Sequence, residues 1–301
     1  MSSELTRYNE LQISSEILDQ PPCPVHTKVF ICSTPRTGSN LLCRAMIHHG
    51  IGIPHEYFHY LHAAIIGPRF GIDTLRNGWL LQSEGEVRRA YIKELINRRT
   101  LNGIFSAKIQ WWEFVSFLDN PEGVQLFHNA KFIHLYREDL LAQAISLHIS
   151  QETGRWGFDH LITTPSETNP NFLHSGQIES YLEEIASHDM HWRMFFARNQ
   201  ILPLTVSYEC LTDDPSQVLR SMVNAFSLEV PTSDFGYTEE RSANARDPRV
   251  PPLSEIKAHF LLARKQLSQA ARGAKKTRRM NKTGRGKSKI SERAARLRGG
   301  T

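Results

Sequence analysis

The chain has few cysteines, and their spacing matches no familiar framework. Its 301 residues include four, Cys23, Cys32, Cys43 and Cys210, and no two of them form a C-x-x-C pair. Secreted disulfide scaffolds use many closely spaced cysteines, and structural zinc sites use paired ones. The sequence therefore predicts a reducing compartment and no structural zinc.

Long apolar runs are also missing. No stretch approaches the roughly 18 uninterrupted apolar residues that a membrane-spanning helix needs, and the N-terminal residues contain no apolar core of a signal peptide. We therefore expect a soluble, cytoplasmic protein that neither spans a membrane nor carries a signal peptide. Peripheral attachment at the inner membrane surface remains open.

Acidic residues are scarce at the C-terminal end. From Arg264 onward the chain has 14 of its 36 Lys and Arg residues but only one of its 31 Asp and Glu residues. The rest of the chain then holds 22 basic and 30 acidic residues, so the net charge of +5 arises in the tail. Such a charged segment without apolar periodicity is typical of disorder. It is also suited to contact anionic lipid or nucleic acid, and both partners stay open.

Length and composition favour one good-sized α/β core. We expect an irregular N-terminal extension over residues 1–27, a folded domain over 28–262 and a basic, disordered tail over 263–301. Apolar and β-branched runs predict strands at 29–32, 103–109, 131–136 and 204–208, and helical periodicity predicts helices at 84–97 and 177–199. Strands separated by helices indicate a three-layer α/β fold, with a mostly parallel central sheet flanked by helices.

The clearest chemistry lies between Val29 and Leu42, where the sequence reads VFICSTPRTGSNLL. An apolar strand passes through a Gly/Ser-rich turn into the start of a helix. Several backbone N–H groups converge at such a point without helical partners, and the helix dipole favours negative charge. The stretch therefore predicts a site for phosphate or sulfate, with an ordinary strand–turn–helix connection as the alternative.

This turn lacks the two residues that phosphoryl transfer uses. With Gly38 as the second glycine of G-x-x-x-x-G-K-[ST], Ser39 replaces the lysine and Asn40 replaces the residue that holds Mg²⁺. Arg36 supplies a cation instead. A small-molecule kinase of the P-loop type is therefore the less favoured enzyme.

A second cation follows another predicted strand. Arg137 comes directly after the strand at 131–136, and the next predicted helix carries Ser146. Ligands of doubly wound sheets bind beyond the carboxyl ends of the strands. Arg36 and Arg137 at one edge of the sheet would provide two anion sites, as a nucleotide with two phosphorylated positions requires.

The segment HEYFH offers a competing interpretation. His55, Glu56 and His59 match H-E-x-x-H, and His62 could be a third ligand. On one helix face these residues would hold zinc, as in a metallohydrolase. Pro54 argues against this, because it places His55 near a helix start, and the anion-binding turn would have no role in such an enzyme.

Five blocks in order resemble the bacterial carbohydrate sulfotransferases of the trehalose 2-sulfotransferase type. They are STPRTGSNLL, GIPHEYFHYLH, GIFSAKIQWW, FIHLYREDLLAQAISL and VSYECLTDDP, and they span roughly residues 28–230. The resemblance implies a P-loop-like fold and 3′-phosphoadenosine-5′-phosphosulfate (PAPS) as sulfuryl donor. It also implies a hydroxyl of a carbohydrate or glycolipid as acceptor, and no metal.

The resemblance also assigns residues to the donor. The turn would bind the 5′-phosphosulfate through Arg36, Thr37, Gly38, Ser39 and Asn40. Arg137 and Ser146 would bind the 3′-phosphate, although the nine-residue step between them differs from the eight-residue step of the cytosolic sulfotransferases.

The catalytic base must differ from that of the cytosolic branch, which carries it as Lys-x-His on the second strand. Here that strand reads Lys108-Ile109-Gln110, and Gln110 cannot take a proton. Glu56 aligns with the carboxylate proposed as base in the trehalose-type enzymes. The resemblance thus implies in-line transfer, with Glu56 accepting the proton of the acceptor hydroxyl and Lys108 near the sulfuryl group. Arg36 and the rest of the turn would stabilise the charge that grows on the leaving phosphate.

The acceptor itself is not specified by the sequence. Trp156, in the segment GRWGF, is the best candidate to stack on a sugar, and core packing is the favoured role of Trp111 or Trp112. Residues 63–83 and 151–169 are expected to shape the pocket. A homodimer is a possible assembly. The alternative to an enzyme is a non-catalytic nucleotide-binding protein.

Overall fold

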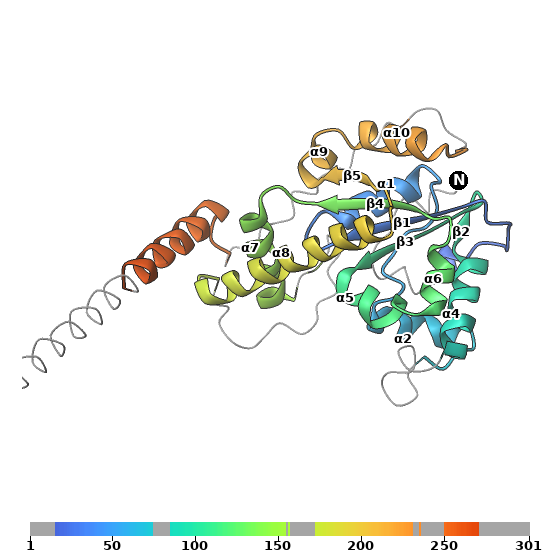
Figure 1. Cartoon of the computed structure of the whole chain (residues 1–301), viewed down its shortest axis with the longest axis horizontal. Coiled ribbons are helices and arrows are strands. Elements are labelled where there is room, and N and C mark those ends of the chain that lie inside the picture. Colours follow the sequence, from blue (N-terminus) through green and yellow to red (C-terminus); the bar gives the residue numbers. More distant parts are fainter. Residues whose placement is uncertain are drawn as a thin grey trace, which may run out of the picture.

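The computed structural model describes residues 16–74, 85–154, 156, 172–230, 235 and 250–270. Five strands form one sheet in the order β2-β3-β1-β4-β5 (Figure 1). The strands are β1 (Thr27–Ser33), β2 (Thr100–Leu101), β3 (Ile104–Gln110), β4 (Lys131–Tyr136) and β5 (Leu204–Ser207). β1 pairs in parallel with β3 and β4, and β4 with β5, whereas the short β2 runs antiparallel at the edge. The predicted mostly parallel α/β sheet is confirmed.

Helices connect the strands and cover both faces of the sheet (Figure 1). They are α1 (Ser39–His48), α2 (Tyr60–Arg69), α4 (Gly85–Arg98), α5 (Trp111–Glu113), η4 (Phe114–Leu118), α6 (Pro121–Phe127), α7 (Leu140–Thr153), α8 (Ser175–Arg198), α9 (Tyr208–Asp213) and α10 (Pro215–Phe226), preceded by the short η3 (Glu16–Leu18). A further helix covers 253–270. Within the part of the chain that the structure describes, no helix is long and apolar enough to cross a membrane.

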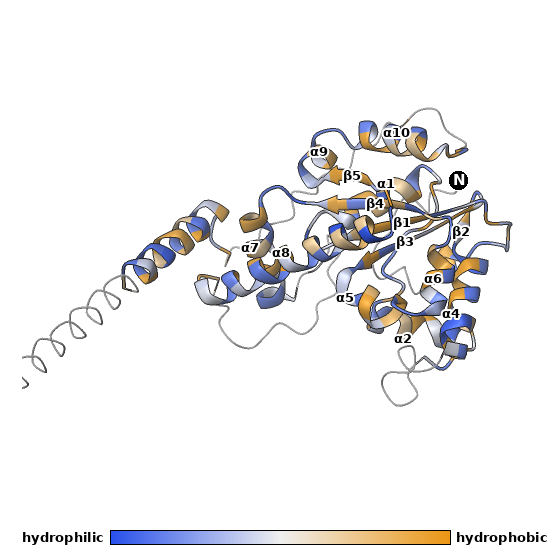
Figure 2. Ribbon diagram, in the orientation of Figure 1, coloured by the Kyte–Doolittle hydropathy of each residue, from blue (hydrophilic) through white to orange (hydrophobic). Residues whose placement is uncertain are grey.

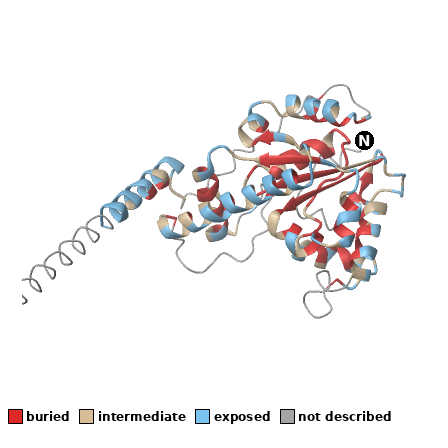
Figure 3. Cartoon of the chain, viewed as in Figure 1, coloured by how far each residue is buried: buried red, intermediate tan, exposed pale blue. Residues whose placement is uncertain are grey.

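The side chains of β1 alternate between two hydrophobic clusters, which makes the fold three-layered. Phe30 and Cys32 point into a cluster with α2, α4, α5 and α8, whereas Val29 and Ile31 point into one with α1 and α10. Figure 2 shows the apolar colouring of the strands, and Figure 3 shows them buried beneath helices whose outer faces are exposed. A central strand buried on both faces reads as a continuous apolar run, as the sequence did.

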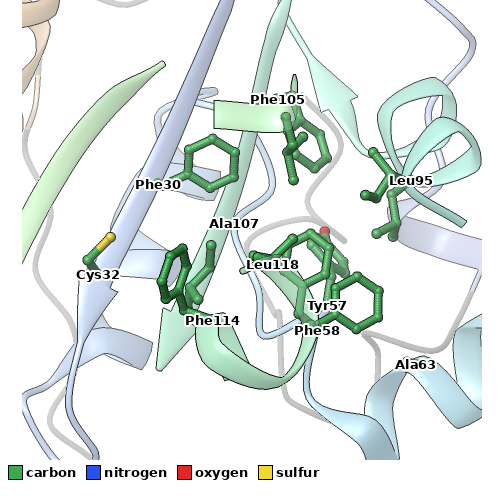
Figure 4. Packing of buried hydrophobic residues seen from close by; sticks show 14 of the residues in the cluster. Phe30, Cys32, Tyr57, Phe58, Ala63, Leu95, Phe105, Ala107, Phe114 and Leu118 are labelled. Atoms are coloured by element: carbon green, nitrogen blue, oxygen red, sulfur yellow. The ribbon is translucent and has the colours of Figure 1, made fainter. Parts of the chain in front are cut away.

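Aromatic rings dominate the first of these clusters (Figure 4). Phe30 meets Phe105 edge-on at 6.3 Å between ring centroids, and Tyr57 stacks on Phe105 at 6.4 Å. The Tyr57 hydroxyl donates a hydrogen bond to the Ile53 carbonyl at 2.6 Å. These contacts hold the segment between α1 and α2 against the sheet, and this segment carries the candidate base.

Trp192 of α8 joins the helix layer to the end of β1. Its side chain is fully buried, and its Nε1 donates a hydrogen bond to the Ser33 carbonyl at 3.0 Å. Ser33 is the last residue of β1 before the anion-binding turn. The contact therefore supports the turn from the side opposite to α1.

Both predicted extensions contribute to the folded part. Leu18 lies in the core, and Asp19 forms an ion pair of 2.8 Å with the fully buried Arg99. At the other end, the helix at 253–270 packs Ile256 and Phe260 against α7 and α8. This helix runs across the predicted start of the tail at 263. Residues 1–15 and 271–301 lie outside the described residues.

We expect Trp192→Ala to lower the free energy of unfolding by about 3–5 kcal/mol, because it removes a large buried ring and one hydrogen bond. Urea denaturation followed by circular dichroism measures the change. Met190 on the same helix is 54% exposed, so Met190→Ala is the matched control, with an expected change within about 0.5 kcal/mol. Equal losses for both variants would contradict this role of Trp192.

Candidate active site

The predicted anion-binding turn connects β1 to α1 and depends on two left-handed residues. Arg36 has φ 68° and Gly38 has φ 78°. A Cβ atom on Gly38 would lie 2.6 Å from Cδ2 of the Tyr208 ring, so only glycine fits without displacing that ring. The turn therefore directs the first backbone N–H groups of α1 toward the carboxyl end of the sheet.

Buried hydrogen bonds hold the turn in shape. The Thr37 hydroxyl donates to the Thr34 carbonyl at 3.0 Å. From α7, Gln143 Nε2 donates to Thr34 Oγ1 at 2.8 Å and to the Pro35 carbonyl at 2.6 Å. Gln143 is 1% exposed. A turn held this way needs little reorganisation to bind an anion, and the sequence offered no local signal for the role of Gln143.

Arg36 joins three distant segments. Its Nε donates to Ser146 Oγ of α7 at 3.0 Å, and its Nη1 donates to the Trp156 carbonyl. The structure thus places Ser146 beside Arg36, whereas the sequence grouped it with Arg137. The contact of Trp156 with Arg36 is through the backbone, and its side chain is 38% exposed.

Arg137 lies at the same edge of the sheet, just beyond β4. Its guanidinium sits 4.4 Å from the centroid of the Tyr208 ring, and its Nε lies 3.9 Å from Glu209 Oε1. That separation is too long for a hydrogen bond, and the buried Nε has no other partner among the described residues. Tyr208 touches both the Gly38 turn and Arg137, so it brings the two predicted cationic sites together.

Lys108 connects the turn to the candidate base. Its Nζ donates to Asn40 Oδ1 at 2.5 Å and lies 3.1 Å from Glu56 Oε1. The backbone of β3 sets this distance, because Lys108 N donates to the His55 carbonyl at 2.9 Å. Lys108 is nearly fully buried, so its charge is directed to these two oxygens.

One oxygen of the Glu56 carboxylate is anchored and the other is open. Oε1 receives Lys108 Nζ and also Gln110 Nε2, the latter at 2.7 Å. Oε2 has no hydrogen-bond partner among the residues that the structure describes. An anchored carboxylate with a free oxygen is the geometry that a general base requires.

Charge around Glu56 keeps it ionised. Burial by itself would raise the pKa of Glu56, but Lys108, His62 and the hydrogen bond from Gln110 lower this pKa well below its ordinary value. Glu56 is thus a carboxylate at neutral pH, which is the ionisation state that a general base needs.

A second carboxyl, Glu113, supports this arrangement from behind. It is fully buried, and its Oε2 accepts a hydrogen bond from the Gln110 backbone at 2.9 Å. Burial, followed by repulsion from Glu56, raises the pKa of Glu113 well above its ordinary value. From the sequence, Gln110 was excluded as a base because it cannot take a proton. The sequence did not reveal that Gln110 orients Glu56 through a hydrogen bond.

The HEYFH segment is not helical. α2 begins at Tyr60, and the ring of His59 caps it by accepting a hydrogen bond from Leu61 N at 3.2 Å. His55 and His59 therefore do not lie one turn apart on a helix, which is the geometry on which the zinc interpretation depends. Burial lowers the pKa of His55, and it lowers the pKa of His59 to about 4. Among the described residues, no group of three or more potential ligands could hold a metal ion.

The two adjacent tryptophans after β3 have different surroundings. Trp111 stacks on His191 at 5.1 Å and packs edge-on against Trp192, so it belongs to the core. Trp112 instead contacts the ring of His59 at 5.1 Å, next to the Glu56 segment. Of the segments expected to shape the acceptor pocket, residues 75–83, 155 and 157–169 lie outside the described residues.

Comparison with known proteins gives consistent results. The Stf0 sulphotransferase family model matches residues 28–248. The chain is 23% identical over 246 residues to the trehalose 2-sulfotransferase of Mycobacterium tuberculosis (strain ATCC 35801 / TMC 107 / Erdman), covering 72% of this chain and 90% of the relative. It is 23% identical over 232 residues to the trehalose 2-sulfotransferase of Mycolicibacterium smegmatis (strain ATCC 700084 / mc(2)155), covering 67% and 85%.

Solved structures give weaker matches. A sulfotransferase from Alicyclobacillus acidocaldarius aligns with a TM-score of 0.39 and 16% identity, covering 79% of this chain and 92% of its own. The sulfotransferase domain from the curacin biosynthetic pathway aligns with a TM-score of 0.38 and 18% identity, covering 74% and 83%.

The ion pair between Lys108 and Glu56 predicts a pH effect on stability. Because the folded-state pKa of Glu56 is lowered, its stabilising contribution is complete above the ordinary value of 4.5 and is lost as the pH falls below it. In Lys108→Met the buried carboxylate loses its cation, so the variant should lose about 3–5 kcal/mol at pH 7. That loss should shrink on acidification, because Glu56 then takes up a proton more readily.

Urea unfolding of wild type and Lys108→Met at pH 7 and pH 4 measures this. Lys257→Met is the control, because Lys257 pairs with Asp139 near the surface and is 29% exposed. An equal loss from Lys108→Met at both pH values would show that the pair does not set the pKa of Glu56.

Proposed function

Because its family model matches residues 28–248, the chain belongs to the Stf0 sulphotransferase family, and we propose that it transfers a sulfuryl group from PAPS to a hydroxyl of a carbohydrate or glycolipid. The proposal rests on the contacts of Lys108, which joins the anion-binding turn to Glu56. Lys108 reaches Asn40 of the anion-binding turn at 2.5 Å and the open-sided carboxylate of Glu56 at 3.1 Å. The two trehalose 2-sulfotransferases among its relatives support a carbohydrate acceptor.

The residues present fit a donor with two anionic ends. The turn from Arg36 to Asn40 offers backbone amides, hydroxyls and the positive end of the α1 dipole to the 5′-phosphosulfate. At the other end, the buried Arg137 Nε has no hydrogen-bond partner among the described residues, as expected of a group reserved for the 3′-phosphate. Ser146 adds a hydroxyl at the turn, where it accepts a hydrogen bond from Arg36 Nε.

The reaction follows from the two oxygens of Glu56. When bound, PAPS supplies the sulfuryl group. Glu56 Oε2 would accept the proton of the acceptor hydroxyl as the hydroxyl oxygen bonds to sulfur, while Oε1 stays anchored by Lys108 and Gln110. The bond from sulfur to the bridging phosphate oxygen would break in the same step, and adenosine 3′,5′-bisphosphate would leave. The turn amides and Lys108 stabilise the negative charge that develops on the leaving phosphate oxygen. Holding the hydroxyl in line supplies further acceleration, since no covalent intermediate is needed.

The competing functions have less support. A kinase lacks the lysine and the Mg²⁺-holding hydroxyl at Ser39 and Asn40. A zinc hydrolase would need the helical HEYFH geometry, which the segment does not adopt.

We propose that the reaction takes place in the cytoplasm. The basic tail is a candidate contact for anionic lipid or nucleic acid, and a homodimer is the candidate assembly.

Glu56→Gln should lower the transfer rate by about 10²–10⁴-fold, because the amide cannot accept the proton. Binding of adenosine 3′,5′-bisphosphate should be unchanged, since the substitution leaves the turn intact. Transfer of radiolabelled sulfate from PAPS to fractionated cell metabolites measures the rate, and isothermal titration calorimetry measures binding.

Glu183 is exposed on α8, so Glu183→Gln should keep full activity. Undiminished turnover in Glu56→Gln would refute the base assignment. Binding of the nucleotide by the wild type without any transfer would favour a non-catalytic binding protein. Loss of transfer on addition of EDTA would favour the zinc alternative.

Arg137→Gln should weaken binding of adenosine 3′,5′-bisphosphate by about 10–100-fold, because a charge-assisted contact to the 3′-phosphate contributes about 1.5–3 kcal/mol. Binding of adenosine 5′-phosphate, which lacks this phosphate, should change little. Titration calorimetry with both nucleotides measures the difference. Arg220 is half exposed on α10, and Arg220→Gln controls for the loss of charge. Equal weakening toward both nucleotides would argue against a role at the 3′-phosphate.

A further inference from the structure

Asp19 lies between η3 and β1, in the segment that the sequence predicts to be an irregular extension. Its Oδ1 is 2.8 Å from Arg99 Nη2, and its Oδ2 accepts a hydrogen bond from Arg69 Nη2 at 2.8 Å. Arg69 is the last residue of α2, and Arg99 lies between α4 and β2. One carboxylate therefore joins the segment before β1 to the ends of two helices.

The ion pair with Asp19 meets the charge of a buried cation. The side chain of Arg99 is 0% exposed, whereas that of Asp19 is 17% exposed. Removing the carboxylate from a buried ion pair is costly, because the charge of its partner is left in the protein interior. The backbone holds the two residues together, since Gln20 N donates to the Arg98 carbonyl at 2.8 Å. The position of Arg99 therefore depends on Asp19.

Arg99 lies close to the residues on both sides of Glu56. Burial raises the pKa of Tyr57, and Arg99 opposes this through its charge and through a hydrogen bond to the Tyr57 side chain. Burial lowers the pKa of His55, and Arg99 is one of the cations that lower it further. The rings of His55 and Tyr57 meet edge-on at 5.6 Å. The neighbours of the candidate base thus pack against each other beside this cation.

The same neighbours fix the backbone of Glu56. The Tyr57 carbonyl accepts a hydrogen bond from the hydroxyl of Tyr91 on α4 at 2.8 Å, and the His55 carbonyl accepts one from Lys108 N at 2.9 Å. Tyr57 and Tyr91 are fully buried, and Figure 4 shows Tyr57 inside the first hydrophobic cluster. The Glu56 carboxylate is therefore placed by anchors one residue to either side, and Arg99 bonds to one of them.

Resting on the function proposed above, we propose that Asp19 is a positioning residue for the catalytic base. Its carboxylate holds Arg99 beside Tyr57. Tyr57 in turn keeps the Glu56 carboxylate within reach of Lys108. A residue outside the predicted domain at 28–262 thus contributes to the transfer of the sulfuryl group.

Asp19→Asn should lower kcat by about 10–100-fold, because a small displacement of the base is enough to slow proton transfer. Binding of adenosine 3′,5′-bisphosphate should be unchanged. Rates are expressed per nucleotide-binding site, counted by titration calorimetry, so that a loss of folded protein does not enter. Asp19→Glu restores the charge and should recover most of the rate. Glu16 is exposed in the same segment, and Glu16→Gln should keep full activity.

A double-mutant cycle with Glu56 separates positioning from a purely structural role. In the Glu56→Gln background, Asp19→Asn should change the residual rate by less than about twofold, because the base that it positions is already lost. Tyr57→Phe removes the hydroxyl and keeps the ring, so it should give the same pattern and replaces Asp19→Asn if that variant does not fold. An equal fractional loss in both backgrounds would overturn the proposal, as would an unchanged kcat in Asp19→Asn.

The ionisation of Glu56 provides a measurement that needs no transfer. ¹³C NMR of labelled carboxyl carbons follows it, and the Glu56 signal is the one missing from Glu56→Gln. Loss of a nearby carboxylate would by its charge alone lower the pKa of Glu56, whereas a looser contact with Lys108 raises it. Asp19→Asn should therefore raise the pKa of Glu56 toward its ordinary value of 4.5. An unchanged or lowered pKa of Glu56 would contradict the positioning role.

These outcomes are separable from failure of the proposed function. If the wild type transfers no sulfate from PAPS to any acceptor while the pKa of Glu56 rises in Asp19→Asn, the sulfotransferase function fails and the positioning of this carboxylate stands. If the wild type transfers sulfate while kcat and the pKa of Glu56 stay unchanged in Asp19→Asn, only the role of Asp19 is refuted.

Discussion

The candidate site depends on one buried cation. A lysine that is almost fully removed from water must have its charge met by nearby oxygens, because an unpaired buried ammonium is costly. Lys108 finds these oxygens on Asn40, in the first turn of α1, and on Glu56, in the segment between α1 and α2. It stands on β3, next to the central strand, so the sheet fixes its position. The start of α1 and the carboxylate of Glu56 are therefore held at a set distance by the fold.

The parallel sheet explains why so many separate segments converge. The carboxyl ends of β1, β3 and β4 lie at one edge, and each leads to a different part of the candidate site. β1 leads into the Gly38 turn, β3 ends at Gln110 beside Glu56, and β4 leads to Arg137. Tyr208, just after β5, packs between the turn and Arg137. Each contact uses a short local element, and the sheet supplies the common frame.

Short-range sequence patterns predicted several strands, helices and the turn after β1. The strand predicted at 131–136 is found with the same bounds, and the helix predicted at 177–199 forms as α8, Ser175–Arg198. The apolar run of β1 and its Gly-containing turn also form as expected. The conformation of the HEYFH segment could not be predicted from local patterns. There, Tyr57 is drawn into the core and the chain turns, so α2 starts only at Tyr60.

The sequence by itself determined the fold class and the strand–turn–helix at Gly38, because strand runs and turn residues are encoded in neighbouring positions. The choice of Glu56 as candidate base came from the resemblance of ordered motif blocks to a family. Only the tertiary structure decided which side chains share partners. It placed Ser146 with Arg36 and Gln110 with Glu56, and it packed Trp111 against Trp192 but Trp112 against the ring of His59. Such pairings join residues far apart in the chain. They follow from how the layers pack, which no local pattern encodes.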